Sequence, residues 1–156
     1  MEATGTAPVR EALSQALDAA GLRSSASLKD SAAVVRAAQR WIQSNIRYLR
    51  EYPETYQTPA RTLEWRVGDC DDQAPLLAAM VRSARIPARL VVVGWDGDDS
   101  PRPVPRHIYA QALLPDGWTT AETVKPVALG WDAGEWKEGQ GRRVAYSLVG
   151  DTGPLG

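Results

Sequence analysis

The chain of 156 residues contains one cysteine, Cys70, and one histidine, His107. A single cysteine excludes an intramolecular disulfide and a cysteine-rich zinc site. No segment approaches the ~20 consecutive apolar residues that a membrane-spanning helix needs. The first five residues, Met1 to Gly5, show neither the basic nor the apolar stretch of a secretory signal. We therefore expect a cytoplasmic protein with no membrane partner.

The charge of the chain is nearly balanced. Lysine and arginine together number 18, aspartate and glutamate 19, and the formal net charge is −1. This balance excludes a strongly basic nucleic-acid binder, so we expect no nucleic-acid partner. The hydrophobic fraction of 44% and the charged fraction of 24% are ordinary for a soluble globular protein. The length fits one domain that holds its core without disulfides or metal.

Apolar periodicity predicts three helices in the first half of the chain. Residues 9–20 indicate a short amphipathic helix, and the serine-rich stretch 23–29 a linker. A second helix, capped by Asp30 or Ser31, runs to about Leu49.

The third predicted helix follows the segment Val67–Asp72 and ends before Pro87. Pro75 has no backbone N–H and is tolerated best in the first helical turn. We therefore expect the cap near Asp71 or Asp72, with Cys70 at the mouth of the helix.

The second half of the chain favours strands. Arg89–Trp95 is rich in β-branched residues, and 107–114 with 118–124 indicates a hairpin. Helices followed by strands predict an α+β fold in which N-terminal helices pack on a small antiparallel sheet. We divide it into residues 1–30, an N-terminal helix and linker; 31–130, the core; and 131–156, an extension that includes a candidate last strand.

Cys70 has two interpretations. A lone cysteine is most often a small buried hydrophobe. However, a helix start stabilises a thiolate, and its N–H groups can also donate to an oxyanion. The neighbouring carboxylates of Asp69, Asp71 and Asp72 oppose the thiolate, so a nucleophilic Cys70 would need a protonated histidine beside it.

His107 is the one candidate for that partner, and hairpin geometry offers it an acid. If the hairpin loop is Pro115-Asp116, Leu114 pairs with Gly117, and His107 and Glu122 become diagonal neighbours on one face of the sheet. If the loop is Asp116-Gly117, His107 pairs with Pro126, and Glu122 still projects to the same face. A three-residue loop would send Glu122 to the other face. Taken singly, His107 fits an exposed histidine and Glu122 a surface carboxylate. Together with Cys70 they fit a general base, its orienting acid and a nucleophile.

The sequence also resembles the transglutaminase-like superfamily over about residues 31–130. The segments Gly68–Ala74, Leu76–Arg82 and Ile86–Val91 resemble its cysteine box. Residues His107–Gln111, Asp116–Trp118 and Glu122–Thr123 resemble its histidine and acid boxes. Upstream, Trp41-Ile42, Asn45–Tyr48 and Gln57–Pro59 resemble microbial members.

This resemblance implies a papain-like fold with Cys70, His107 and Glu122 as the catalytic residues and no cofactor or metal. The usual third residue of the family is aspartate, so Glu122 is one methylene longer. The Cys70 N–H would be one oxyanion donor, with Gln57, Tyr48 or Trp41 as side-chain candidates. Trp41 also fits the apolar stripe of the second helix.

Three functions remain open at this stage. The first is acyl transfer at an amide bond through a Cys70 thioester, with water as acceptor, giving peptide or isopeptide hydrolysis on a peptide or protein substrate. The second uses an amine acceptor, as a protein-glutamine transglutaminase does. The third is a non-catalytic scaffold, with Trp131 and Trp136 on a partner surface. A calcium loop at Asp96–Asp99 is disfavoured because alternating ligands and a later bidentate glutamate are missing.

Overall fold

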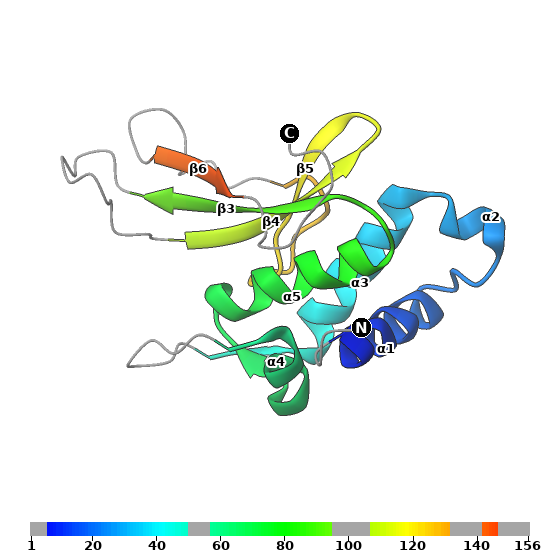
Figure 1. Ribbon diagram of the computed structural model, residues 1–156, viewed down its shortest axis with the longest axis horizontal. Coiled ribbons are helices and arrows are strands. Elements are labelled where there is room, and N and C mark those ends of the chain that lie inside the picture. Colours follow the sequence, from blue (N-terminus) through cyan, green and yellow to red (C-terminus); the bar gives the residue numbers. More distant parts are fainter. Residues whose placement is uncertain (1–5, 50–56, 95–106, 132–141, 147–156) are drawn as a thin grey trace.

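The computed structural model describes residues 6–49, 57–94, 107–131 and 142–146 (Figure 1). The expected turn at Asp96–Asp99 and Trp136 lie outside these ranges. The helices are α1 (Thr6–Ala19), α2 (Ser25–Leu28), α3 (Ser31–Asn45), α4 (Pro59–Trp65) and α5 (Cys70–Ser83). The strands are β1 (Arg47–Tyr48), β2 (Val67–Gly68), β3 (Ala88–Gly94), β4 (His107–Leu114), β5 (Gly117–Ala121) and β6 (Arg142–Tyr146).

Two sheets form. β3, β4, β5 and β6 make an antiparallel sheet in the order β5-β4-β3-β6, while β1 and β2 pair in parallel. In the β4–β5 hairpin Leu114 pairs with Gly117, which leaves Pro115-Asp116 as the two-residue loop. The first of the two predicted registers is therefore the one that forms.

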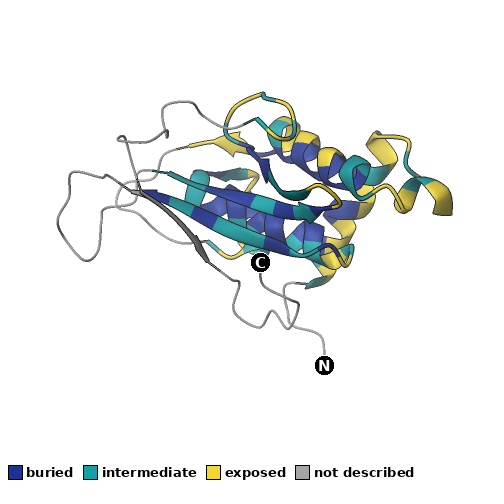
Figure 2. Ribbon diagram, turned by 90° about the horizontal axis from the view of Figure 1, so that it is seen from above, coloured by how far each residue is buried: buried dark blue, intermediate teal, exposed yellow. Residues whose placement is uncertain are grey.

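Helices α3 and α5 lie on one face of the antiparallel sheet, where both contact β4, and α1 packs against these two helices (Figures 1 and 2). One apolar cluster joins these layers. Its largest fully buried side chains include Ile42, Leu76, Leu77 and Met80. The α+β arrangement of N-terminal helices on a small antiparallel sheet is confirmed. Within the described ranges, no helix is long and apolar enough to span a membrane.

Helix α3 begins as predicted but ends early. The side chain of Asp30 caps it by accepting the Ala33 N–H at 3.1 Å. It stops at Asn45 instead of Leu49, because Ile46 is extended and the next two residues pair with β2. The predicted linker contains the short helix α2, capped by Ser24, and α4 was not predicted at all.

Helix α5 begins earlier than its proline suggested. Asp69 is the cap and Cys70 the first helical residue, so the predicted cap at Asp71 or Asp72 is wrong. The cap is reciprocal: Asp69 Oδ1 accepts the Asp71 N–H at 3.0 Å, and Asp72 Oδ2 accepts the Asp69 N–H at 3.2 Å. These bonds stabilise the helix start at Cys70, and Pro75 therefore lies inside the helix and not in its first turn.

Candidate active site

Cys70 lies at the N-terminal end of α5, directly after β2. It is half-buried, not sealed in the core. The Asp69 side chain accepts the Asp71 N–H, and the Asp72 side chain accepts the Asp69 N–H. Among the described residues no side chain accepts the Cys70 N–H. The thiol therefore sits at the positive end of a helix next to an available backbone donor.

Gly68 allows β2 to approach this helix start closely. A Cβ atom at Gly68 would meet the Asp72 Cβ at 2.7 Å, which is closer than real side chains pack. Asp72 is fully buried, and its carboxylate accepts the Gln57 N–H at 3.0 Å and the Gln57 Nε2 at 3.1 Å. The missing side chain at Gly68 thus makes room for the carboxylate that connects the helix start to Gln57.

His107 begins β4, and its ring is bonded to Glu122, which comes directly after β5. His107 Nε2 lies 2.6 Å from Glu122 Oε2, and only 15% and 5% of the two side chains are exposed. The second oxygen, Oε1, accepts the N–H groups of Thr123 at 3.1 Å and Val124 at 3.3 Å. The glutamate folds back on its own backbone, and this conformation takes up its additional methylene while Oε2 reaches the ring.

The third contact connects His107 to Cys70, whose thiol hydrogen-bonds the imidazole. Because Nε2 is bonded to Glu122, Nδ1 is the ring nitrogen left for the thiol. Burial, the largest single influence, lowers the pKa of His107, but the hydrogen bonds and charges of Cys70 and Glu122 outweigh it and raise the pKa to about 9. The ring is therefore protonated at neutral pH.

Carboxylates crowd the other side of the thiol. Burial and the charges of Asp72 and Asp71 raise the pKa of Asp69 to about 6. Asp71 Oδ1 lies 4.0 Å from Cys70 Sγ, at the outer limit for a hydrogen bond to sulfur. The positive charge of the protonated imidazole thus opposes the negative charge of these carboxylates beside Cys70. The sequence predicts such a histidine if Cys70 is a nucleophile.

These two pKa values predict two separate pH windows for stability. The pKa of His107 rises from 6.5 to about 9 on folding, so its stabilisation is complete below pH 6.5 and is lost as the pH rises through 9. The pKa of Asp69 rises from 3.8 to about 6, so the folded chain holds that proton more tightly and stability falls between those pH values.

Replacing the His107 imidazole should distinguish the pH range in which His107 affects stability from the range that belongs to Asp69. In urea titrations, we expect His107→Gln to remove the fall of about 3 kcal/mol in unfolding free energy between pH 6.5 and 9. The fall between pH 4 and 6, which belongs to Asp69, should remain. A parallel decline of wild type and variant above pH 6.5 would contradict the assigned contacts of His107.

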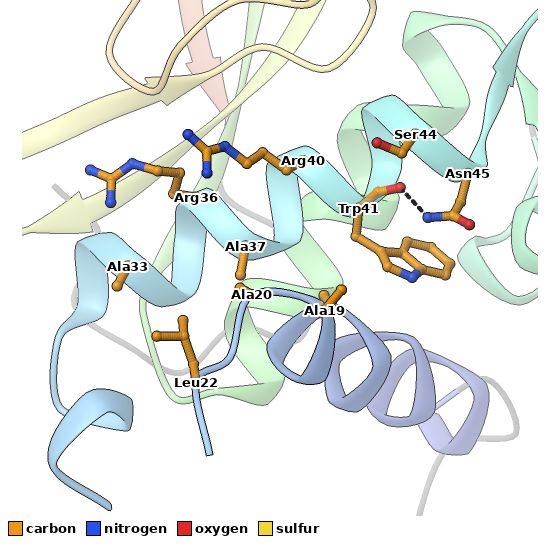
Figure 3. A pocket seen from close by; sticks show the side chains of 11 residues that line it. Ala19, Ala20, Leu22, Ala33, Arg36, Ala37, Arg40, Trp41, Ser44 and Asn45 are labelled. Carbon is orange, nitrogen blue, oxygen red and sulfur yellow. Dashed lines mark hydrogen bonds between the residues drawn. The ribbon is translucent and has the colours of Figure 1, made fainter. Parts of the chain in front are cut away.

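The three side-chain oxyanion candidates lie in different surroundings. Gln57 is held by Asp72, two residues beyond Cys70 on α5. Tyr48 is 48% exposed on β1 and pairs with Gly68 in the backbone register. Trp41 is buried on α3, where it lines a pocket beside α1 (Figure 3), and the Arg66 guanidinium lies 4.8 Å from its ring centroid. Trp41 thus serves the core.

Asp72, which connects Gln57 to the start of α5, was not predicted from the sequence as a residue of the site. A signal was present, because Asp69 and Asp72 have the spacing of a capping box. The contact with Gln57 joins residues 15 positions apart and has no local signature.

Residues 19–123 match the profile of the transglutaminase-like superfamily, about two thirds of the chain. The chain belongs to the transglutaminase-like superfamily. Two solved structures share the fold. A candidate cysteine protease from Cytophaga hutchinsonii aligns with a TM-score of 0.55 and 19% identity, over 99% of this chain and 56% of that one. A candidate protease from Parabacteroides distasonis aligns with a TM-score of 0.63 and 15% identity, over 97% of this chain and 32% of that one.

The chain thus spans about half of one of these two neighbours and a third of the other. No protein of curated function matches it. Membership places the chain among cysteine-based hydrolases and transferases, and the resemblance noted from its cysteine, histidine and acid segments is confirmed at the level of the superfamily.

Proposed function

We propose that the protein catalyses acyl transfer at an amide bond, with Cys70 as nucleophile, His107 as general acid and base, and Glu122 as the acid that orients the ring. The observation that carries the proposal is the continuous chain of hydrogen bonds from the thiol through the imidazole to the carboxylate. A half-buried thiol at a helix start, next to a protonated imidazole, is the environment of an activated cysteine.

The steps follow from the positions of these groups. The Cys70 sulfur attacks the amide carbonyl carbon, and its proton resides on His107. The carbonyl oxygen becomes an oxyanion, then re-forms the C=O bond as the C–N bond breaks. His107 gives its proton to the leaving nitrogen, which leaves as an amine or ammonia, and a thioester remains. Attack by an acceptor, whose proton returns to His107, releases the acyl group and regenerates Cys70.

Two donors are proposed for the oxyanion: the Cys70 N–H and the Gln57 side-chain amide. Gln57 Nε2 donates a hydrogen bond to Asp72 Oδ2 at 3.1 Å, which keeps the amide close to the helix start. Gln57→Ala should lower kcat by about 10²- to 10³-fold with a smaller change in KM, because an oxyanion donor acts on the transition state.

The matching test is Tyr48→Phe, which removes the competing hydroxyl. Steady-state kinetics of the two variants discriminate between the donors. A large loss of kcat in Tyr48→Phe, with Gln57→Ala close to wild type, would overturn the choice of Gln57.

For the acceptor we propose water, so that the reaction is hydrolysis of a peptide or isopeptide bond in a peptide or protein substrate. The two neighbours support this choice, since both are candidate proteases. The alternative is a primary amine, which would give a transglutaminase. The test incubates the protein with an unstructured protein substrate, with and without a labelled alkylamine.

New free amino termini, or free lysine side chains from isopeptides, would support hydrolysis. Incorporation of the labelled amine into glutamine residues with release of ammonia, and no cleavage, would replace hydrolysis by transamidation. Both products should vanish in Cys70→Ala. Products that persist in that variant would overturn the mechanism itself.

A further inference from the structure

Two glutamines of α3 reach across to the segment that follows β5. Gln39 Nε2 donates to the carbonyl oxygens of Glu122 at 2.9 Å and Val127 at 3.2 Å. Gln43 Nε2 lies one helical turn further along and donates to Glu122 at 3.1 Å, Lys125 at 2.9 Å and Val127 at 3.0 Å. Two side-chain amides thus bind three carbonyl groups of one short segment, which we call the acid loop (residues 122–127).

We propose that Gln39 and Gln43 are positioning residues, which act through Glu122 by holding its main chain where the carboxylate meets His107. This inference rests on the proposed function, since it assigns the glutamines to the same site. Neither glutamine was a candidate from the sequence, and neither has a contact with Cys70 or His107 among the hydrogen bonds of the described residues.

The acid loop needs such support because the sheet no longer provides it. β5 ends at Ala121, so the β4–β5 ladder stops one residue before the acid. Glu122 already uses its side chain on His107, Thr123 and Val124. Its carbonyl group is instead held from α3, by Gln39 and Gln43. The acid is therefore fixed at both its side chain and its main chain.

The burial of Gln39 argues that this contact is specific. Gln39 is only 1% exposed and lies among the apolar residues Val35, Ala38 and Ile42 of the same helix. A buried amide is costly unless its hydrogen bonds are satisfied. Its N–H groups are satisfied by Glu122 and Val127, residues more than 80 positions away. A leucine at this position would fit the helix equally well but would leave the two carbonyl groups without that donor.

The chain offers an unusually direct probe, because His107 is its only histidine. NMR titration of the imidazole in the full chain reports the His107–Glu122 contact without any turnover. We expect Gln39→Met/Gln43→Met to lower the pKa of His107 from about 9 toward 6.5 by at least about one unit. In the same variant kcat/KM should fall about 10- to 100-fold, mainly through kcat.

The matched control is Gln111→Met. Gln111 accepts a hydrogen bond from Arg89 Nε at 2.9 Å and donates to Thr120 Oγ1 at 3.1 Å, so its loss removes side-chain bonds from the same sheet without touching the acid loop. Its His107 titration should match wild type. If the double variant does not fold, Gln43→Met, at the half-buried position, should give a smaller shift in the same direction.

A folded double variant with an unchanged His107 titration would overturn the positioning role, whatever its activity. An equal shift in Gln111→Met would overturn it as well, because the effect would then be general destabilisation. If wild type shows no turnover but the pKa of His107 still falls in the double variant, the proposed reaction is overturned. The positioning of Glu122 by the two glutamines would remain supported. The two failures are therefore distinguishable.

Discussion

Cys70→Ala should lower kcat/KM for amide substrates by about 10⁴- to 10⁶-fold, the loss expected when a covalent nucleophile is removed. The substitution removes the only thiol in the chain, so no other cysteine can substitute for it. Alanine is a good helix former and leaves the Asp69–Asp72 cap intact, so the fold should be retained. The measurement is single-turnover kinetics with circular dichroism of the same sample.

Cys70→Ser is the natural companion to this variant. A hydroxyl keeps the position and the hydrogen-bonding capacity but gives up its proton far less readily than a thiol. We expect turnover in Cys70→Ser close to that of Cys70→Ala. Substantial turnover in either variant would mean that the reaction uses a different nucleophile. Absence of turnover in wild type as well would indicate a scaffold whose cysteine is incidental.

Glu122→Gln should lower kcat/KM by about 10³- to 10⁴-fold, as expected when the acid behind a catalytic imidazole becomes an amide. The change removes the negative charge that raises the pKa of His107 and replaces one carboxylate oxygen by an NH2 donor, so that pKa should fall toward 6.5. The ring would then be mostly neutral above pH 7, where wild type keeps it protonated. The pH dependence of kcat/KM and the NMR titration of His107 both report this change.

Glu122→Asp provides a sharper version of the same test. Aspartate is the usual residue of the family, yet here the longer side chain reaches His107 while its second oxygen is bonded to the N–H groups of Thr123 and Val124. The shorter side chain cannot keep all three contacts on the present backbone. We therefore expect a loss of activity smaller than that of Glu122→Gln. Wild-type activity in Glu122→Asp would show that the folded-back glutamate is not required.

Much of the candidate site could be predicted because its geometry follows from local rules. Side chains alternate between the two faces along each strand, and the two-residue loop fixes the register, so His107 and Glu122 share a face once Leu114 pairs with Gly117. The helix start after Gly68 likewise placed Cys70 at a helix mouth. Both rules depend on a few neighbouring residues, which is why the sequence alone reveals them.

The rest depends on contacts that neighbouring residues do not encode. Pro75 suggested a later start for α5, but the reciprocal cap of Asp69 and Asp72 prevails. Asp72 accepts a hydrogen bond from Gln57, and Gln39 donates one to the acid loop. Both bonds join a side chain to a segment that is distant in the sequence. On a helical wheel Gln39 resembles any polar interruption of an apolar stripe. Its role becomes visible only when the carbonyl groups it binds are located.

The most direct test of the account is the rate at which Cys70 reacts with iodoacetamide between pH 5.5 and 8.5, read by intact mass because the chain has one thiol. If His107 holds the sulfur as a thiolate, wild type should react at least about tenfold faster than His107→Ala across this range, because the variant lacks the group that takes up the thiol proton. Superimposable pH profiles of the two proteins would contradict the account.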